Sequence, residues 1–345
     1  MKLLIVGSDK VFSIENFYCK YLKELGVDVK CFTAQSIFYN YYYSGNIVTK
    51  VLFKLGLSNI YKKINNQLKQ IVSDFKPEII WVFKGMEITP ESLIWAKQQG
   101  VKLINYNPDN PFIFSGKGSG NINITKSISL YDLHFTYNLE IQKKLKKKYQ
   151  ANTVYLPFAF DVSKDIFEEC SNEKEIIKVC FLGNPDKKRA KFILHLAEKG
   201  IMIDVFGNEW NKFINHKNII TYPPVYADEQ WKTLRKYRVQ INLLRIHNED
   251  SHNMRTFEVP GIGGIQLAPY TIEHNILFED GKEIFLFKNI DECMSKIKYL
   301  LSLTSYQANQ LRIFERTASI DKKHNYKDRS IQVFETFKNI NNKFN

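Results

Sequence analysis

The sequence has no long apolar run. None of its hydrophobic stretches approaches the roughly 20 residues that a membrane-spanning helix needs. The apolar run at the N-terminus, Leu3–Val6, is also too short to be the core of a secretory signal peptide. We therefore expect a cytoplasmic protein.

Cysteine is scarce and follows no pattern. The chain has five cysteines among 345 residues, and their spacing matches no metal site. We expect them to be reduced and mostly buried as small apolar residues. The seven histidines form no metal-ligand pair on one helix face, and no D-x-D motif stands out. The sequence therefore predicts no metal cofactor.

Arginine is absent from the first half. Residues 1–162 carry 21 lysines and 12 acidic residues, a net charge of +9, whereas residues 163–345 hold all eight arginines at a net charge of +4. Lysine gives diffuse positive potential, and arginine binds phosphate in a fixed geometry. The first half therefore suits an anionic surface and the second a specific anionic ligand. A solvated lysine-rich face without function would explain the first half equally well.

Strand and helix patterns alternate through both halves, which predicts an α/β protein with two doubly wound parallel sheets. There is no G-x-G-x-x-G, so the dinucleotide fingerprint is absent. We expect an N-terminal domain over 1–162, a second over 163–320 that opens with an acidic linker at 163–175, and a C-terminal helix in 321–345 that returns to the first domain. The expected strands are 2–7, 27–32, 79–83, 101–105 and 131–137, then 176–182, 201–206, 219–222, 239–244, 265–268 and 284–287.

Two carboxylates of the first half follow predicted strands. Asp9 comes after Gly7, and Asp109 follows the strand at 101–105. Ligands of open α/β sheets bind beyond the carboxyl ends of the strands, so either acid is a candidate catalytic base. Asp109 between two prolines would equally suit an Asx-turn or helix cap. The glycine-rich segment 116–120 is better explained as a mobile loop than as a phosphate cradle.

The segment 38–43 is densely aromatic and lies near several lysines. Such a stretch can lie at a membrane interface or stack on a sugar, but buried helix packing is the commoner explanation. The helix expected at 139–149 is strongly basic, which suits either a solvated face or anionic lipid.

The second half places cations, glycines and one acid at successive strand ends and around one helix–strand junction. A nucleoside diphosphate needs backbone NH groups and cations for its phosphates and a carboxylate for its ribose. Each residue alone has a plainer explanation, such as a Gly C-cap, and only their coincidence favours a ligand site. The candidates are Gly183, Arg189, Gly207, Arg245, Arg255, Glu258, Gly263 and Gly264, with Lys188 as a further cation.

The second half resembles a known family. The resemblance is carried by Phe181-Leu182-Gly183, Val205–Trp210, Gln240–Leu243, Asn253–Leu267, Glu279–Ile284 and His324–Arg329. These runs are similar to the family-1-type transferase domain of the CgeB-like (spore-maturation-like) proteins, which belong to the GT-B glycosyltransferases. The resemblance is good over 176–335 and looser over 1–160, where it rests on fold order and on Asp109-x-Pro111.

The resemblance implies a GT-B fold, with two Rossmann-like domains facing a cleft. It implies sugar transfer from a nucleotide-diphosphate-sugar held by the second domain to an acceptor on the first, without a metal. A glutamate before the glycine turn contacts the donor ribose in such domains, a role that falls on Glu258. Many retaining relatives carry an earlier acid in an E-x7-E arrangement. Here that position is Asp250, beside Glu249, so retaining and inverting chemistry both stay open.

The acceptor is the least defined part. The lysine-rich first half and the aromatic segment suggest a glycan, a lipid-linked intermediate or a cell-surface polysaccharide, with the protein peripheral on the inner face of a membrane. Three other classes stay open: a non-catalytic sugar-nucleotide-binding protein, another sugar-nucleotide enzyme such as an epimerase, and an anionic-surface binder. The basic residues follow no nucleic-acid-binding motif, so we expect no nucleic acid partner.

Overall fold

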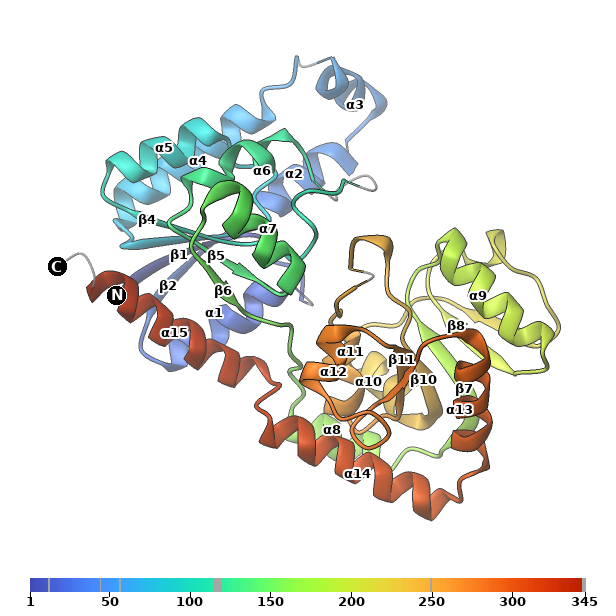
Figure 1. The fold of residues 1–345 in the computed structure, drawn as a ribbon. Coiled ribbons are helices and arrows are strands. Elements are labelled where there is room, and N and C mark those ends of the chain that lie inside the picture. The colour runs from blue at the N-terminus through green and yellow to red at the C-terminus, as the bar shows by residue number, and fades with distance from the viewer. Residues whose placement is uncertain (12, 44, 56, 115–119, 249, 343–345) are drawn as a thin grey trace. The chain divides into compact units, whose positions relative to one another are not determined.

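The computed structural model describes residues 1–345 except 12, 44, 56, 115–119, 249 and 343–345. The chain forms two compact units: unit 1 is Met1–Pro157 with Ser330–Asn345, and unit 2 is Phe158–Arg329 (Figure 1). The division thus falls five residues before the expected boundary at 162. Residues 321–329 belong to unit 2, and only the segment from Ser330 onward belongs to unit 1. Most of the glycine-rich segment 116–120 lies outside the described residues.

Unit 1 is a six-stranded parallel sheet in the order β2-β1-β3-β4-β5-β6. The central strand β3 (Ile79–Phe83) is buried along its whole length, as expected for a parallel strand covered on both faces. The other strands are β1 (Lys2–Val6), β2 (Asp28–Phe32), β4 (Lys102–Tyr106), β5 (Leu133–Thr136) and β6 (Thr153–Tyr155).

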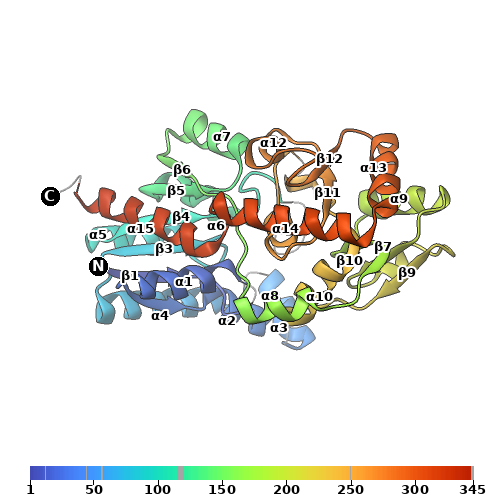
Figure 2. The same ribbon diagram turned by 90° about the horizontal axis from the view of Figure 1, so that it is seen from below.

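Helices cover both faces of this sheet (Figures 1 and 2). Ile80 and Val82 pack toward α4 and α5, whereas Trp81 faces Tyr18 of α1 and Phe337 of α15, at ring-centroid distances of 4.8 and 5.5 Å. The alternation follows from the two-residue period of a strand. The helices are α1 (Ile14–Glu24), α2 (Ala34–Tyr43), α3 (Ile47–Lys54), α4 (Ile60–Phe75), α5 (Pro90–Gln98), α6 (Ile122–Ser127), α7 (Leu139–Tyr149) and, from Ser330 onward, α15 (Tyr326–Asn342).

Unit 2 is also a six-stranded parallel sheet, in the order β12-β11-β10-β7-β8-β9. Its strands are β7 (Ile176–Leu182), β8 (Ile203–Phe206), β9 (Ile219–Tyr222), β10 (Tyr237–Ile241), β11 (Gln266–Pro269) and β12 (Phe285–Phe287). Its helices are α8 (Lys164–Ser171), α9 (Lys187–Glu198), α10 (Ala227–Lys236), α11 (Arg255–Gly261), α12 (Ile272–Leu277), α13 (Ile290–Ser302) and α14 (Ser305–Asp321). None of the described helices in either unit is long and apolar enough to cross a membrane.

The expected linker at 163–175 is wrong, because most of it is helix α8. Ser163 caps the helix by accepting a hydrogen bond from the backbone NH of Ile166 at 3.2 Å. Cys170 is buried against Leu234 and Val259 in a small apolar cluster. The linker was predicted from the acidic composition of the segment. Its apolar residues, however, share one face of a helix, which is an amphipathic pattern.

Candidate functional site

The strand order indicates where unit 2 would bind a ligand. Its order is that of a Rossmann sheet, with the reversal between β7 and β10, and ligands of such sheets bind at the carboxyl ends of the strands next to the reversal. We call this edge the carboxyl edge of unit 2. Gly183 follows β7, Gly207 follows β8, and Arg245 lies in the loop after β10.

The turns after β7 and β8 pack directly on one another. A Cβ added to Gly207 would lie 2.3 Å from the carbonyl oxygen of Gly183, so only glycine fits there. Trp210 Nε1 donates a hydrogen bond to that same carbonyl at 2.8 Å, and the backbone NH of Asn208 donates to Asn184 Oδ1 at 2.9 Å. The two predicted glycines therefore allow the turns after β7 and β8 to pack closely at the carboxyl edge.

Arg189 joins the loops on both sides of the strand reversal. Its guanidinium donates to the carbonyl oxygen of Asn184 at 3.1 Å and to that of Leu243 at 2.5 Å. Burial, and next the positive charge of Arg245, lower the pKa of Arg189 to about 10. Arg189 Nε also lies 3.5 Å from Asp186 Oδ2, whereas Arg245 is exposed and forms no ion pair with a carboxylate of the described residues. Two neighbouring cations at this position would be stabilised by a bound anion.

Glu258 lies in α11, and its carboxylate is held by one partner. Arg255 Nη1 donates to Glu258 Oε2 at 2.6 Å, and the Glu258 side chain is only 9% exposed. Arg255 was expected to contact the donor's phosphates, but its charge is already paired with this acid. The arginine therefore fixes the orientation of the carboxylate that was expected to accept ribose hydroxyls.

Gly263 and Gly264 were predicted to offer backbone NH groups to the donor, and this is wrong. They follow the C-terminus of α11 and lead into β11, so they lie at the amino ends of the strands, opposite the carboxyl edge. Their NH groups already donate to the carbonyl oxygens of Pro260 and Val259, at 2.9 and 2.8 Å. A Cβ at Gly264 would lie 2.4 Å from the carbonyl oxygen of Leu234, so its glycine serves helix packing.

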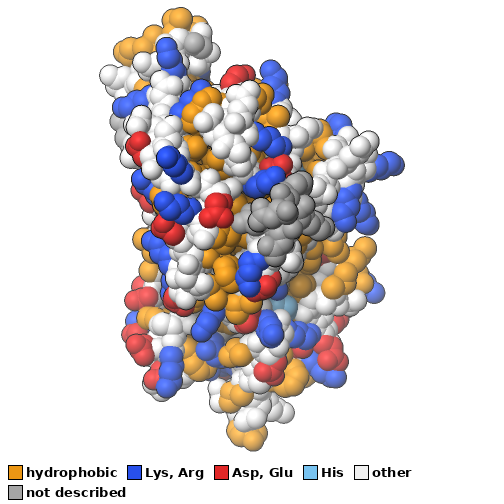
Figure 3. All heavy atoms as spheres, turned by 90° about the vertical axis from the view of Figure 1, so that its left-hand side faces the viewer, with side chains coloured by type: hydrophobic (Ala, Val, Ile, Leu, Met, Phe, Trp, Pro, Cys, Tyr) orange, Lys and Arg blue, Asp and Glu red, His pale blue; other side chains and the backbone are white. Residues whose placement is uncertain are grey.

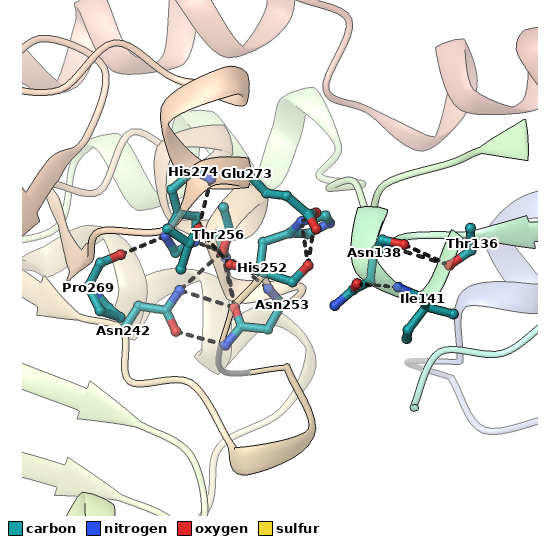
Figure 4. Close-up of polar contacts among 12 residues, drawn as sticks. Thr136, Asn138, Ile141, Asn242, His252, Asn253, Thr256, Pro269, Glu273 and His274 are labelled. Carbon is teal, nitrogen blue, oxygen red and sulfur yellow. Dashed lines mark hydrogen bonds and ion pairs between the residues drawn. The ribbon is translucent and has the colours of Figure 1, made fainter. Parts of the chain in front are cut away.

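A buried polar network fixes the start of α11 (Figure 4). Asn242, after β10, exchanges two hydrogen bonds with Asn253, at 2.8 and 3.1 Å. Asn253 Oδ1 in turn accepts from the backbone NH of Thr256 at 3.1 Å. The network thereby sets where α11, and with it Glu258, begins. Its asparagines fall inside the family-like runs, but nothing in their spacing predicted the pairing.

His274 completes this network in one fixed tautomer. Its Nδ1 lies 2.8 Å from the carbonyl oxygen of Pro269, which can only accept, so Nδ1 carries the hydrogen. Nε2 then accepts from the hydroxyl of Thr256 at 3.0 Å. Burial lowers the pKa of His274 to about 4, so the ring is neutral near pH 7. A second buried histidine, His252, lies 2.8 Å from Glu273 Oε2 (Figure 4). Asp250, the candidate earlier acid, is exposed, and Glu249 lies outside the described residues.

The carboxyl edge of unit 1 collects acids around one lysine. Its strand order reverses between β1 and β3, and Lys84 directly follows β3 with a left-handed φ of 64°. Lys84 Nζ lies 2.6 Å from Asp109 Oδ2. The predicted base Asp109 is therefore paired with an ammonium group. The other predicted base, Asp9, is exposed and hydrogen-bonds the hydroxyl of Ser36.

Two buried acids of this edge were missed from the sequence. Burial raises the pKa of Glu87 to about 7, although the Lys84 charge opposes the shift. Burial also raises the pKa of Glu15, whose Oε1 accepts from the backbone NH of Ser8 at 2.8 Å. Glu87 lies three residues after Lys84. Its position shortly after a predicted strand could have identified it as a candidate from the sequence. Within the described residues, no group of three or more His, Cys, Asp or Glu side chains could hold a metal ion.

Comparisons with solved structures agree with the fold. Sucrose-phosphate synthase from Thermosynechococcus elongatus matches 99% of this chain and 99% of its own, at 9% identity and a TM-score of 0.71. HepE from Anabaena in complex with UDP-glucose matches 98% and 100%, at 12% identity and 0.65. A putative UDP-N-acetylglucosamine 2-epimerase from Listeria monocytogenes matches 99% and 97%, at 11% identity and 0.58. The predicted fold class is confirmed: the chain has the GT-B fold.

The family comparison concerns mainly unit 2. Residues 188–335 match the model of a family described as glycosyl transferase-like. No curated protein sequence matches the chain at a significant level. Residues 188–335 are therefore similar to a glycosyl transferase-like domain, in a chain that has the GT-B fold.

Proposed function

We propose that this protein transfers a sugar from a nucleotide-diphosphate-sugar, bound at the carboxyl edge of unit 2, to a hydroxyl group of an acceptor bound by unit 1. The observation that carries the proposal is the pair Arg189 and Arg245, which places two cations at the strand reversal of a glycosyltransferase domain. HepE, of the same fold, has been solved with UDP-glucose.

Each residue of the carboxyl edge has a part in this proposal. Arg189 and Arg245 bind the diphosphate and neutralise the charge that it gains on leaving. Glu258, oriented by Arg255, accepts hydrogen bonds from the ribose hydroxyls. The turns at Gly183 and Gly207 let the donor approach the backbone closely. We propose that the guanidinium groups act on the diphosphate without a metal.

The acceptor hydroxyl must lose a proton as it reacts. Its oxygen forms a bond to the anomeric carbon of the sugar, the bond from that carbon to the phosphate oxygen breaks, and the electron pair leaves with the nucleoside diphosphate. The proton passes to a base. Asp109 and Asp9 are candidates from the sequence, and we add Glu87, because a carboxyl with a pKa of about 7 is suited to proton transfer near neutral pH.

The acceptor that we propose is a glycan, a lipid-linked intermediate or a cell-surface polysaccharide. The support is the net charge of +9 over residues 1–162, which suits a protein peripheral on the inner, anionic face of a membrane. On this proposal the chain belongs to the CgeB-like branch of the family and acts in the cytoplasm in polysaccharide biosynthesis.

The test is a thermal-shift screen with UDP, GDP, CDP, ADP and TDP. A diphosphate present at 100 times its dissociation constant should add about 2.7 kcal/mol of stability. We expect one diphosphate to raise Tm in the wild type and not in Glu258→Ala. The control is Glu279→Ala, which removes an exposed glutamate of the same unit that is paired with Lys282, and it should keep the shift.

Two results would count against the proposal. If no diphosphate raised Tm in the wild type, unit 2 would not bind such donors. If the bound sugar nucleotide were converted to its epimer without any acceptor, the activity would be that of an epimerase, a class that shares this fold.

A further inference from the structure

Helix α3 turns an apolar face to solvent. None of its eight residues is buried, and Ile47, Val48, Val51 and Leu52 are 79, 57, 48 and 37% exposed. The face continues beyond the helix, with Leu55 at 66% and Leu57 at 70% exposure. Six large aliphatic side chains within eleven residues therefore meet water, which is unusual for a soluble surface. Figure 3 shows hydrophobic side chains gathered at its upper end, the height at which α3 lies in Figure 1.

The opposite face of α3 is firmly attached to unit 1. Phe53 contacts the rings of Phe38, Tyr42 and Tyr61, at centroid distances of 5.2, 5.2 and 5.6 Å. Asn46 caps the helix by accepting from the backbone NH of Thr49 at 3.0 Å. The exposed face is thus presented by a packed helix and not by an unstructured loop.

This packing also decides between the two explanations of the aromatic segment 38–43. Phe38 stacks on Tyr42 and on Tyr61, at 5.7 and 5.6 Å, so these rings mainly serve helix packing. Tyr39 and Tyr43 remain 43% exposed. The sequence drew attention to the aromatic segment, whereas the exposed apolar surface belongs to the helix that this segment supports.

The stretch of sequence that contains α3 carries charge of one sign only. Residues 29–73 contain six lysines and no aspartate or glutamate. Lys54 on α3 and Lys62 and Lys63 on α4 are exposed. A helix with an aliphatic face and lysines beside it has the composition of an interfacial helix, whose apolar side chains enter the acyl region while its cations meet anionic headgroups. Exposed tyrosines near such a face suit the headgroup level.

We infer that α3 with Leu55 and Leu57 is a membrane-docking surface for a bilayer that contains anionic lipid. The inference deepens the proposed function, on which it rests: it assigns the acceptor to the membrane surface and names the element that brings the protein there. Aliphatic insertion supplies the affinity, and the lysines select anionic headgroups.

The experiment is co-flotation of the full-length protein with vesicles of phosphatidylcholine, with and without phosphatidylglycerol. We expect binding to the anionic vesicles that weakens with added salt. The variant Ile47→Ser/Leu55→Ser/Leu57→Ser should lose at least tenfold in binding. The matched control, Ile272→Ser/Ile276→Ser, removes two aliphatic side chains of α12 that are 67 and 60% exposed, and should bind as the wild type does.

Two readouts separate this inference from the proposed function. The α3 variant should keep the thermal shift with the nucleoside diphosphate, which also shows that it is folded. The inference is overturned if the wild type does not float with anionic vesicles at low salt, or if the α3 variant binds as well as the wild type. Self-association that is lost in the α3 variant, without vesicle binding, would assign the surface to a second copy of the chain.

Discussion

The carboxyl edges of the two sheets have the same architecture and opposite chemistry. In unit 2 the strand reversal between β7 and β10 carries Arg189 and Arg245, whereas in unit 1 the reversal between β1 and β3 gathers Glu15, Glu87 and Asp109 around Lys84. Both sheets are parallel and six-stranded. The fold therefore supplies the place where a ligand binds. The residues in the loops and first helical turns after the strands determine whether that place attracts an anion or holds a proton.

The largest effect is expected from Glu87→Gln in unit 1. In the folded state Glu87 keeps its proton up to a pKa of about 7, against 4.5 when unfolded, so the folded state binds more protons between these values. The free energy of unfolding should therefore fall as pH rises through this window, by roughly 2 to 3 kcal/mol from pH 5 to pH 8. Glu87→Gln should remove this dependence of the free energy of unfolding on pH. Hydrogen exchange of the β3 amides, followed from pH 5 to pH 8, measures it.

The control for this measurement is Glu140→Gln, at an exposed position of α7. It should retain the wild-type dependence on pH. If the Glu87→Gln protein lost as much stability as the wild type between pH 5 and pH 8, Glu87 would not hold a proton at neutral pH. The two carboxyl edges would then differ only in that unit 2 carries arginines.

The next effect concerns the cations of unit 2. Arg189→Ala removes a charged donor from the carboxyl edge and should weaken binding of the nucleoside diphosphate about 30-fold, the equivalent of about 2 kcal/mol. Binding of the nucleoside without phosphates should change little. Isothermal titration calorimetry with both ligands distinguishes loss of a phosphate contact from collapse of the site.

Arg316→Ala is the matched control for Arg189. Arg316 is also largely buried, and its guanidinium stacks on the ring of Phe167 at 3.6 Å and bonds the carbonyl oxygen of Gly261, away from the carboxyl edge. This variant should lose stability and keep its affinity for the diphosphate. Equal losses of affinity in both variants would contradict a specific role for Arg189.

The smallest effect is expected from His274→Gln. The pKa of His274 is lowered to about 4, from 6.5 when unfolded, so the unfolded state binds more protons between these values and unit 2 loses stability as pH falls. The residue should account for roughly 1 to 2 kcal/mol between pH 7 and pH 5. Hydrogen exchange of the β11 amides should show a shallower acid-side loss in the variant, and an unchanged slope would mean that His274 is charged in the folded state.

The sequence predicted the two sheets well, because buried parallel strands such as Ile79–Phe83 are continuous apolar runs bounded by turns. It also indicated which strand ends carry cations, since Arg189 and Arg245 lie in the segments that follow such runs. It did not predict that Arg255 pairs with Glu258, because both the phosphate contact and the ion pair are compatible with a three-residue spacing on a helix.

The remaining errors have physical causes of their own. Gly263 and Gly264 were assigned to the ligand site because a pair of glycines can serve either ligand binding or close packing, and the sequence does not distinguish the two. The structure shows that they follow helix α11 and lie at the opposite edge of the sheet. Glu15 and Glu87 went unnoticed because a burial that shifts a carboxyl pKa is a property of tertiary packing.

Helix α15 has a consequence for the order in which the protein can be made. Phe337 is fully buried against Trp81 and Phe135, yet it is synthesised after the whole of unit 2. During translation, unit 2 can complete its core while unit 1 still lacks the ring that covers one face of β3. Residues 1–157 produced alone would expose this aromatic surface, so unit 1 depends on a segment that is synthesised after unit 2.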